Sequence, residues 1–328
     1  MDRLSQLQQW LESLAENTYT NLQPASADAS FRQYFRVTDK NDNKTYIVMD
    51  APPEKEDSRP FMLVTDLIRR AKVNAPNIIA VDAKQGFLLL DDLGTRPYLD
   101  ELNDDTAEKL YIDAIEALLK LQNIDGMLPA YNAKLLLAEM DLFETWYLNR
   151  HLNIELGKTQ KAVLNNVFKF LIKNAEEQPQ VFVHRDYHSR NLMITDENNP
   201  GVIDYQDAVF GPITYDLVSL LKDCYIEWPR EKIEHWLDHY LARLTPHRFI
   251  EKHTLVRWFD LMGVQRHLKI LGIFARLNYR DGKPQYLNDL PLTLKYIIDA
   301  CERYDELKPL KQLLDDPILQ SKNSRAIA

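Results

Sequence analysis

Glycine is scarce in this chain of 328 residues, with nine in total and the first at Gly86. The P-loop and the Rossmann dinucleotide motif both need several glycines in a turn between a strand and a helix. The positions of the glycines exclude both motifs. Any nucleotide must therefore be bound in another way.

Cysteine and long apolar runs are also lacking. The two cysteines, Cys224 and Cys301, are too few for a disulfide framework and lack metal-site spacing, so we expect buried thiols. No run of about 18 apolar residues occurs, and the first residues lack the apolar core of a signal peptide. We therefore expect a cytoplasmic protein that does not bind a membrane.

Positive charge is in the minority, with 40 Lys and Arg against 49 Asp and Glu and a net charge of -9. Nucleic acids and anionic membranes attract basic surfaces, so this balance argues against both as partners. Nothing in the sequence indicates an obligate protein partner. Apolar residues make up 45% of the chain and charged residues 27%, which is typical of a globular protein, and the length favours two lobes.

A dense group of polar residues lies at positions 184–191, which read His-Arg-Asp-Tyr-His-Ser-Arg-Asn between two apolar, strand-like segments. So many polar groups would not be tolerated in a core segment without a function. The order of His184, Asp186 and Asn191 is that of kinase catalytic loops, in which the Asp accepts a hydroxyl proton and the Asn binds magnesium. We predict a catalytic loop, with Asp186 and His184 as catalytic residues.

A second metal ligand is expected at Asp204, which ends a short apolar run after the turn-like cluster 196–200. If the flanking segments form an antiparallel hairpin, residue 195 lies opposite 200, 193 opposite 202 and 191 opposite 204. Opposite residues have Cβ atoms roughly 4.5–5.5 Å apart. We therefore predict that Asn191 and Asp204 bind one Mg²⁺ ion. The alternative is that these polar residues only cap turns and end a strand.

Residues 184–191 and 204–208 resemble the protein-kinase-like small-molecule phosphotransferases, the aminoglycoside and choline kinase superfamily. More narrowly, they resemble the bacterial anomeric kinases of N-acetylmuramate and N-acetylglucosamine, which serve cell-wall recycling. The resemblance implies transfer of phosphate from ATP, with Mg²⁺, to the anomeric hydroxyl of an amino sugar. It spans nearly the whole chain, and the narrower resemblance is concentrated in 181–216 and 262–290.

This resemblance implies an α+β, bilobal protein-kinase-like fold with a small β-rich N-terminal lobe and a large helical C-terminal lobe. The predicted domains are 1–93, which binds the nucleotide, and 94–328, which carries the catalytic loop and the acceptor site. Apolar periodicity agrees with this division. It predicts a helix at 3–16, strands within 22–38 and at 45–50, 78–81 and 87–90, a helix starting at 58–60, and helices at 105–122, 134–152, 158–176, 213–225, 230–243, 249–278, 288–304 and 306–315.

The resemblance also implies the nucleotide contacts, with a loop at Ala25–Ser30 covering the phosphates and a hinge at 91–94 recognising adenine. The cofactor-binding residues expected are Ser26, Ser30, Arg32, Asp91 and Leu93. One departure concerns strand three, because relatives generally end it with a phosphate-binding Lys and this chain has Met49. A thioether cannot replace an ammonium group. We expect Arg32, aided by Arg36, to replace it; otherwise both arginines are edge charges.

The acceptor side is expected to involve the cation-rich stretch 265–283. The substrate residues that the resemblance implies are His188, Arg190, Gln206, Asp207, Arg266 and His267. The local excess of Arg and His suits the carboxylate of N-acetylmuramate better than a quaternary ammonium group or a polycationic antibiotic. A kinase of another small alcohol or amine, such as choline or an aminoglycoside, and a non-catalytic pseudokinase remain alternatives.

Two residues near the loop are expected to have structural roles. Asp216 begins a helix and should bond back to the catalytic loop. Only six residues separate Asp204 from Gly211, which leaves no room for a regulatory activation loop. Arg185 is therefore not expected to bind a phosphorylated residue of its own chain.

Overall fold

The computed structural model describes residues 2–14, 18–26, 31–244 and 249–316. The chain divides into two compact units. Residues 1–98 and 191–207 form the first, here called the β unit, and residues 99–190 and 208–328 form the second, the helical unit. The lobes expected from the sequence, 1–93 and 94–328, stay a prediction.

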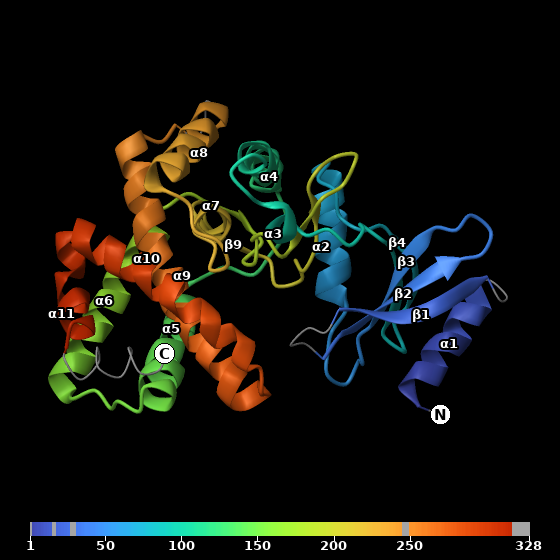
Figure 1. The fold of residues 1–328 in the computed structure, drawn as a ribbon, viewed down its shortest axis with the longest axis horizontal. Coiled ribbons are helices and arrows are strands. Elements are labelled where there is room, and N and C mark those ends of the chain that lie inside the picture. The colour runs from blue at the N-terminus through green and yellow to red at the C-terminus, as the bar shows by residue number, and fades with distance from the viewer. Residues whose placement is uncertain (1, 15–17, 27–30, 245–248, 317–328) are drawn as a thin grey trace. The chain divides into compact units, whose positions relative to one another are not determined.

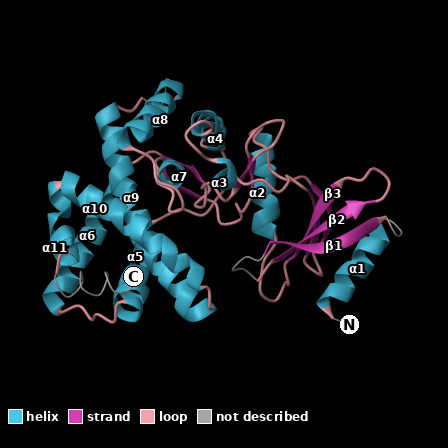
Figure 2. Cartoon of the chain, in the orientation of Figure 1, coloured by secondary structure: helices cyan, strands magenta, loops and turns pink. Residues whose placement is uncertain are grey.

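The β unit is built on an antiparallel sheet with the strand order β1-β2-β3-β5-β4 (Figures 1 and 2). One side of the sheet packs on the first helix, whose apolar residues Leu7, Trp10 and Leu11 share a face and lie against a core that includes Val48 and Phe87. The elements are α1 (Arg3–Leu14), β1 (Tyr19–Ser26), β2 (Gln33–Asp39), β3 (Thr45–Asp50), α2 (Arg59–Arg70), β4 (Ile78–Asp82) and β5 (Phe87–Asp91), followed after an interval by β7 (Leu192–Met193) and β8 (Gly201–Val202).

The helical unit is organised around its longest helix, α9 (Lys252–Asp281), which contacts most of the other helices. Gly272 lets α9 approach the C-terminal end of α5, because a Cβ atom there would lie 2.4 Å from the carbonyl carbon of Leu142. The other elements are α3 (Tyr98–Glu101), α4 (Ala107–Leu121), α5 (Ala133–Leu142), the π-helical η1 (Phe143–His151), α6 (Lys158–Glu176), β6 (Gln180–Val183), β9 (Val209–Pro212), α7 (Tyr215–Leu221), α8 (Arg230–Arg243), η3 (Pro284–Asp289), α10 (Leu290–Arg303), η4 (Asp305–Leu307) and α11 (Lys308–Leu314).

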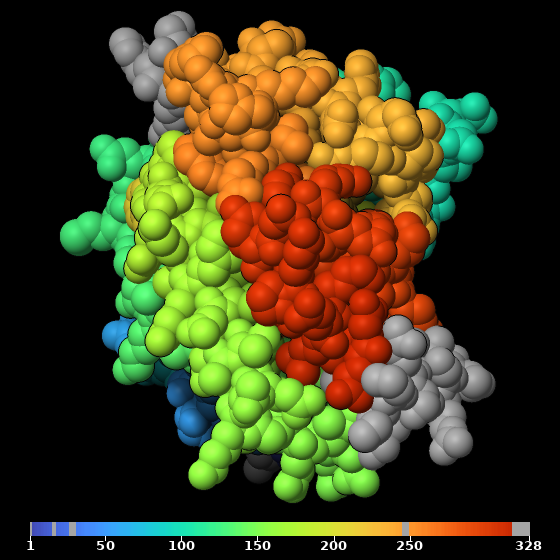
Figure 3. All heavy atoms as spheres, turned by 90° about the vertical axis from the view of Figure 1, so that its left-hand side faces the viewer, coloured from blue at the N-terminus to red at the C-terminus, as the bar shows by residue number. Residues whose placement is uncertain are grey.

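The C-terminal helices complete the core of this unit. Figure 3 shows α10 and α11, in red, against the yellow-green segment that contains α6. Cys224 and Cys301 lie in the buried core, so the expected buried thiols are confirmed. None of the helices in the described ranges is long and apolar enough to cross a membrane.

The predicted helices and strands agree closely with the structure, and α6 and α8 match residue for residue. Several features were missed, among them the short helix α3. The segment predicted as one helix at 134–152 changes from α-helix to π-helix at Phe143. Strand β9 was not predicted, although it pairs with β6 along its whole length.

Candidate active site

The catalytic loop follows β6 and is anchored through its backbone. The N–H groups of His184 and Arg185 donate to Oδ2 and Oδ1 of Asp216, at 2.7 and 3.1 Å. Asp216 is buried in the first turn of α7, and burial raises its pKa to about 7 against the lowering effect of these donors. The structural role predicted for Asp216 is confirmed.

His184 supports the next residues of the loop. Its ring is fully buried and lies edge-on to Tyr187, with the ring centroids 5.7 Å apart. Nδ1 accepts the N–H of Asp186 at 3.2 Å. This contact holds the backbone of Asp186, and the catalytic role of His184 stays a prediction.

The side chain of Asp186 is surrounded by cationic groups. Burial would raise its pKa, but Lys269, Arg266, His188 and Arg185 outweigh that effect and lower the pKa to about 2. Asp186 is therefore ionised at neutral pH. An ionised carboxylate only accepts hydrogen bonds, and it can receive the proton of a hydroxyl group.

The two predicted substrate residues on α9 point in different directions. Nη1 of Arg266 donates to the carbonyl of Arg185 at 3.0 Å, so Arg266 faces the catalytic loop. Nε2 of His267 lies 3.0 Å from the carbonyl of Lys222, and its ring stacks on Tyr296. Burial lowers the pKa of His267 to about 3. Successive helical residues are about 100° apart, which explains the divergence.

Tyr225 brings the other two loop residues together. The ring of His188 meets it edge-on at 5.5 Å, and the guanidinium of Arg190 lies over it at 3.5 Å. Burial lowers the pKa of His188. Between them, the Ser189 N–H donates to Asp223 at 3.0 Å. Neither Tyr225 nor Asp223 was predicted, since each follows the end of a helix without a recognisable motif.

The predicted hairpin exists in the β unit, but its predicted register is wrong by one residue. Leu192 lies opposite Val202 and Met193 opposite Gly201. The reason is in the turn, where the Thr195 N–H binds the side chain of Asn199 at 3.2 Å. Residue 195 therefore does not pair with residue 200, and the strands part earlier than predicted.

Asn191 and Asp204 nevertheless lie side by side. Asp204 has a φ of 64°, a left-handed conformation that changes the direction of its side chain relative to an extended strand. Its Oδ2 accepts from Nδ2 of Asn191 at 3.4 Å, and its Oδ1 accepts from Nε2 of Gln206 at 2.9 Å. The predicted proximity of the two side chains is confirmed, although it arises from the backbone twist and not from a directly opposed pair.

This pair offers oxygen ligands of the kind that Mg²⁺ prefers. Rotation of the Asn191 amide would present its oxygen beside the Asp204 carboxylate. Over the described ranges, no three or more His, Cys, Asp or Glu residues form a group that could hold a metal. Magnesium commonly uses one or two carboxylates and keeps water and phosphate ligands, so the pair fits such an ion.

Contacts within the β unit hold the segment that carries Asp204 in place. Tyr205 stacks on Phe61 of α2 at 5.1 Å, and its hydroxyl lies 2.8 Å from Oγ1 of Thr65. Leu93 packs on the hairpin, since a Cβ atom at Gly201 would lie 2.9 Å from its Cδ1. The segment after β8 is thus fixed to α2 and to the predicted hinge.

Comparison with known proteins decides the family. Residues 21–252 match the model of a phosphotransferase enzyme family. The chain belongs to this phosphotransferase family. The family and the enzyme class predicted from the sequence are therefore confirmed.

Full-length relatives are similar as well. A protein from Pseudomonas aeruginosa named N-acetylmuramate/N-acetylglucosamine kinase is 44% identical, over 95% of this chain and 96% of the relative. A protein of the same name from Neisseria meningitidis is 41% identical, with 96% of each chain covered.

Solved structures of phosphotransferases share the fold. An ADP-bound aminoglycoside phosphotransferase has a TM-score of 0.61 at 15% identity, over 89% of this chain and 97% of its own. Choline kinase from Streptococcus pneumoniae has a TM-score of 0.65 at 12% identity, over 90% and 99%. At such identities the likeness concerns the fold alone, and it confirms the predicted bilobal kinase-like architecture.

In this phosphotransferase the arginines expected to replace the lysine are both ion-paired. Nη2 of Arg32 lies 3.0 Å from Glu56, and Nε of Arg36 lies 2.5 Å from Asp92. Met49 is fully buried in the sheet. The carboxylate partners could not be predicted, because they are distant in sequence.

The remaining predicted residues lie in the β unit. Asp91 ends β5, and its N–H donates to the carbonyl of Asn77 at 3.0 Å. Asp207 is exposed. Ser26 ends β1, whereas Ser30 lies outside the described residues. These residues keep their predicted roles as proposals.

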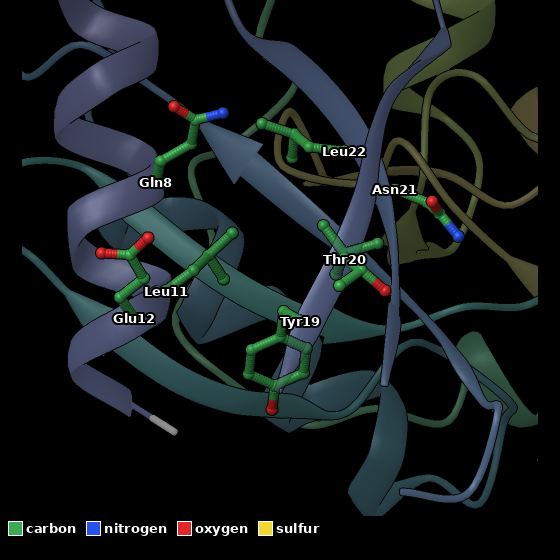
Figure 4. Close-up of a pocket in the computed structure, with 8 residues that line it drawn as sticks. Gln8, Leu11, Glu12, Tyr19, Thr20, Asn21 and Leu22 are labelled. Carbon is green, nitrogen blue, oxygen red and sulfur yellow. The ribbon is translucent and has the colours of Figure 1, made fainter. Parts of the chain in front are cut away.

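A cavity of about 260 Å³ lies between α1 and β1, and none of the predicted site residues lines it (Figure 4). Gln8 and Glu12 of α1 and Tyr19 and Thr20 of β1 are on its wall. Its lining carries no carboxylate–cation pair like those around the catalytic loop. We assign it no role in phosphate transfer.

Proposed function

We propose that this chain is an ATP-dependent kinase that phosphorylates the anomeric hydroxyl of N-acetylmuramate, N-acetylglucosamine or both, in peptidoglycan recycling. The observation that carries the proposal is full-length similarity. Three proteins named N-acetylmuramate/N-acetylglucosamine kinase are 41%, 44% and 45% identical to the chain over at least 95% of its length. A fourth of the same name is 29% identical.

Asp186 is the base in the proposed reaction. The attacking hydroxyl oxygen forms a bond to the γ-phosphorus of ATP and gives its proton to Asp186. The bond from that phosphorus to the bridging oxygen breaks, and ADP leaves with the electron pair. Because phosphoryl transfer needs little covalent help, the main contribution of Asp186 is to orient the hydroxyl.

Asn191 and Asp204 would hold Mg²⁺ through their side-chain oxygens. The ion would neutralise charge on the phosphate oxygens as it builds up. Gln206 donates to Asp204 at 2.9 Å and so keeps that carboxylate oriented. The fit of this oxygen pair supports Mg²⁺ as the cofactor.

The cations around the loop support an anionic acceptor. Lys269 and Arg266 lie close enough to Asp186 to lower its pKa, and the guanidinium of Arg190 lies over the ring of Tyr225, 3.5 Å from its centroid. N-acetylmuramate carries a carboxylate that such groups attract, whereas choline and aminoglycosides are cationic. This charge pattern supports the amino sugar over the other acceptors.

The test is release of ADP over a panel of N-acetylmuramate, N-acetylglucosamine, choline and an aminoglycoside. We expect activity with one or both amino sugars, an acid-labile product, and none with a methyl glycoside that blocks the anomeric oxygen. Equal phosphorylation of the methyl glycoside would assign another hydroxyl. Turnover of choline or the aminoglycoside alone would overturn the proposal, and no turnover at all would indicate a pseudokinase.

A further inference from the structure

A buried cluster of charged and polar side chains links the catalytic loop to three helices of the same unit, α5, α7 and α9. Glu139 of α5 accepts from the guanidinium of Arg185 and from the hydroxyl of Tyr131. Nζ of Lys269 on α9 lies 3.0 Å from Glu139 and 3.0 Å from the hydroxyl of Tyr215. We call these five residues the Glu139 cluster. No local sequence pattern marks this cluster, because its members are far apart along the chain.

The side chains of this cluster are shielded from water. Those of Glu139 and Lys269 are 8% and 7% exposed, and that of Arg185 is 18% exposed. Burial would raise the pKa of Glu139, but Lys269 and Arg185 outweigh it and lower the pKa. Glu139 is therefore ionised, and its charge balances two cations that could not otherwise be buried beside the loop.

Arg185 directly precedes the predicted base and has an unusual backbone. Its φ of 77° lies in the left-handed region, which residues with a Cβ atom rarely adopt because the conformation is strained. Such a conformation persists only when the surroundings determine it. The backbone dihedrals of residue 185 set the direction in which the chain continues to Asp186, so the strain affects the base.

The surroundings hold Arg185 through both its backbone and its guanidinium. Its N–H donates to Asp216 at 3.1 Å, and its carbonyl accepts from Arg266 at 3.0 Å. The guanidinium binds Glu139 and lies over the ring of Tyr131 at 5.5 Å. Of these anchors, Glu139 is the carboxylate that fixes the side chain.

We propose that Glu139 is a positioning residue for Asp186, because it supplies a permanent carboxylate that fixes Arg185 and with it the strained backbone of the catalytic loop. In kinases that are switched on by phosphorylation, new pairs between Arg and a phosphorylated residue order a loop. In this chain the carboxylate of Glu139 has the role of the phosphate group. The loop is ordered without modification. The inference rests on the proposed role of Asp186 but not on the identity of the sugar.

The test compares Glu139→Gln with the wild type and with Asp260→Asn. Asp260 is a matched control on α9, because it is fully buried and also binds several cations, but it does not contact the catalytic loop. We expect Glu139→Gln to lower kcat by about 10²-fold, the scale of a misplacement near 1 Å, with KM for ATP and sugar unchanged. Asp260→Asn should lower Tm but leave kcat near the wild-type value.

Two further variants guard against a failure to fold. Glu139→Asp keeps the charge and should recover part of kcat. Tyr131→Phe removes one donor to Glu139 and keeps the ring, so it should lower kcat by about tenfold or less. A kcat of Glu139→Gln within about threefold of the wild type would overturn the proposal. So would an equal loss of kcat in Asp260→Asn.

A readout without substrate separates this inference from the sugar assignment. Amide hydrogen exchange in residues 184–190 should be faster in Glu139→Gln than in the wild type and unchanged in Asp260→Asn. If the wild type turns over no amino sugar, the proposed function fails while this comparison still decides the role of Glu139. Phosphatase treatment of the wild type should leave kcat unchanged, and a loss would assign Arg185 to a phosphorylated residue.

Discussion

Two buried charge clusters of similar composition meet on helix α9. In the first, Glu139 binds Arg185 and Lys269. In the second, Asp260 binds Lys222 at 2.9 Å and Arg230 at 2.7 Å. Both surround one carboxylate with cations where water is excluded. They differ in what they connect, since the first contacts the catalytic loop and the second joins the residue after α7 to the start of α8.

We expect the location of a buried charge cluster to decide the effect of mutating it. Burying a carboxylate and its cations gives little net stability, because desolvation offsets the attraction. Removal of one partner is costly in either place, since the others are left buried and unpaired. A cluster beside the reacting groups should therefore change the rate, whereas a cluster between helix ends should change the stability.

The largest effect is expected at Asp186. Its loss of kcat is the upper limit for the loss that a change in the Glu139 cluster can cause. Asp186→Asn keeps nearly the same shape and cannot take a proton, so kcat should fall by about 10²–10⁴-fold, while nucleotide affinity and the fold persist. Steady-state kinetics and thermal unfolding measure the two properties. If kcat of Asp186→Asn lies within about threefold of the wild-type value, Asp186 is not the base. The Glu139 cluster would then have no predicted effect on the rate, and the two clusters would not differ in function.

The second cluster should respond in the opposite way. Asp260→Asn leaves Lys222 and Arg230 without their buried counter-ion, so it should lower the free energy of unfolding by about 3–5 kcal/mol. The hydroxyl of Tyr304 also donates to Asp260, at 2.9 Å. Tyr304→Phe should cost about 1 kcal/mol and serves as a milder variant. Urea unfolding measures the free energy of unfolding of both variants. A wild-type value for Asp260→Asn would show that the second cluster does not stabilise the fold.

The dependence of stability on pH provides a further test of the second cluster. Burial would raise the pKa of Asp260, but Lys222 and Arg230 outweigh it and lower the pKa to about 2. In the unfolded chain the pKa is about 3.9. The stabilising contribution is therefore complete above pH about 4 and is lost as the pH falls towards about 2. The difference in stability between the wild type and Asp260→Asn should shrink over this range, and a difference independent of pH would contradict it.

Local sequence patterns were sufficient for much of the fold. The bounds of α6 and α8 follow from apolar residues at three- and four-residue intervals, and the spacing of Asn191 and Asp204 led to a hairpin that is present. The hairpin register was predicted wrongly, because the side chain of Asn199 accepts the N–H of Thr195. The spacing of residues along the sequence does not reveal this hydrogen bond.

Contacts between distant segments could not be predicted. Glu139, on a helix 46 positions before Arg185, looks like any acidic residue in the sequence. The same holds for Glu56 and Asp92, which bind the arginines that were expected to meet phosphate. Charge partners depend on tertiary packing, whereas apolar periodicity depends on neighbours along the chain.

A smaller effect is expected at Asn191 and Asp204 of the β unit, the proposed metal ligands, because they lie outside both charge clusters. Asp204→Asn removes one charge from the proposed ion site, so it should raise the Mg²⁺ concentration for half-maximal activity by about tenfold or more. Asp196→Asn is the matched control, since Asp196 is an exposed residue of the same hairpin. Equal behaviour of the two variants would exclude Asp204 as a ligand.

The smallest effect is expected at the ion pair of Arg32 and Glu56, whose side chains are 10% and 19% exposed. Phosphate charge needs a cation in addition to magnesium, and the chain has Met49 where the family resemblance implies a lysine. We predict that Arg32→Ala raises KM for ATP by roughly tenfold, about 1.4 kcal/mol, the scale of one charge-assisted contact. Arg36→Ala should have a smaller effect, because Arg36 binds Asp92 and the carbonyl of Gly94.

Glu56→Gln distinguishes a phosphate ligand from a structural pair. If Arg32 only stabilises the β unit through its ion pair with Glu56, Arg32→Ala and Glu56→Gln should both lower Tm. Neither variant should then change KM for ATP. If Arg32 binds phosphate, Glu56→Gln releases it from a competing carboxylate, so KM for ATP should stay the same or fall while Arg32→Ala raises it. ATP kinetics at saturating sugar and thermal unfolding separate these cases. Wild-type KM values for ATP in Arg32→Ala and Arg36→Ala would show that neither arginine replaces the lysine that the family resemblance implies. The charged groups of this chain would then act on the catalytic loop and on stability but not on ATP binding.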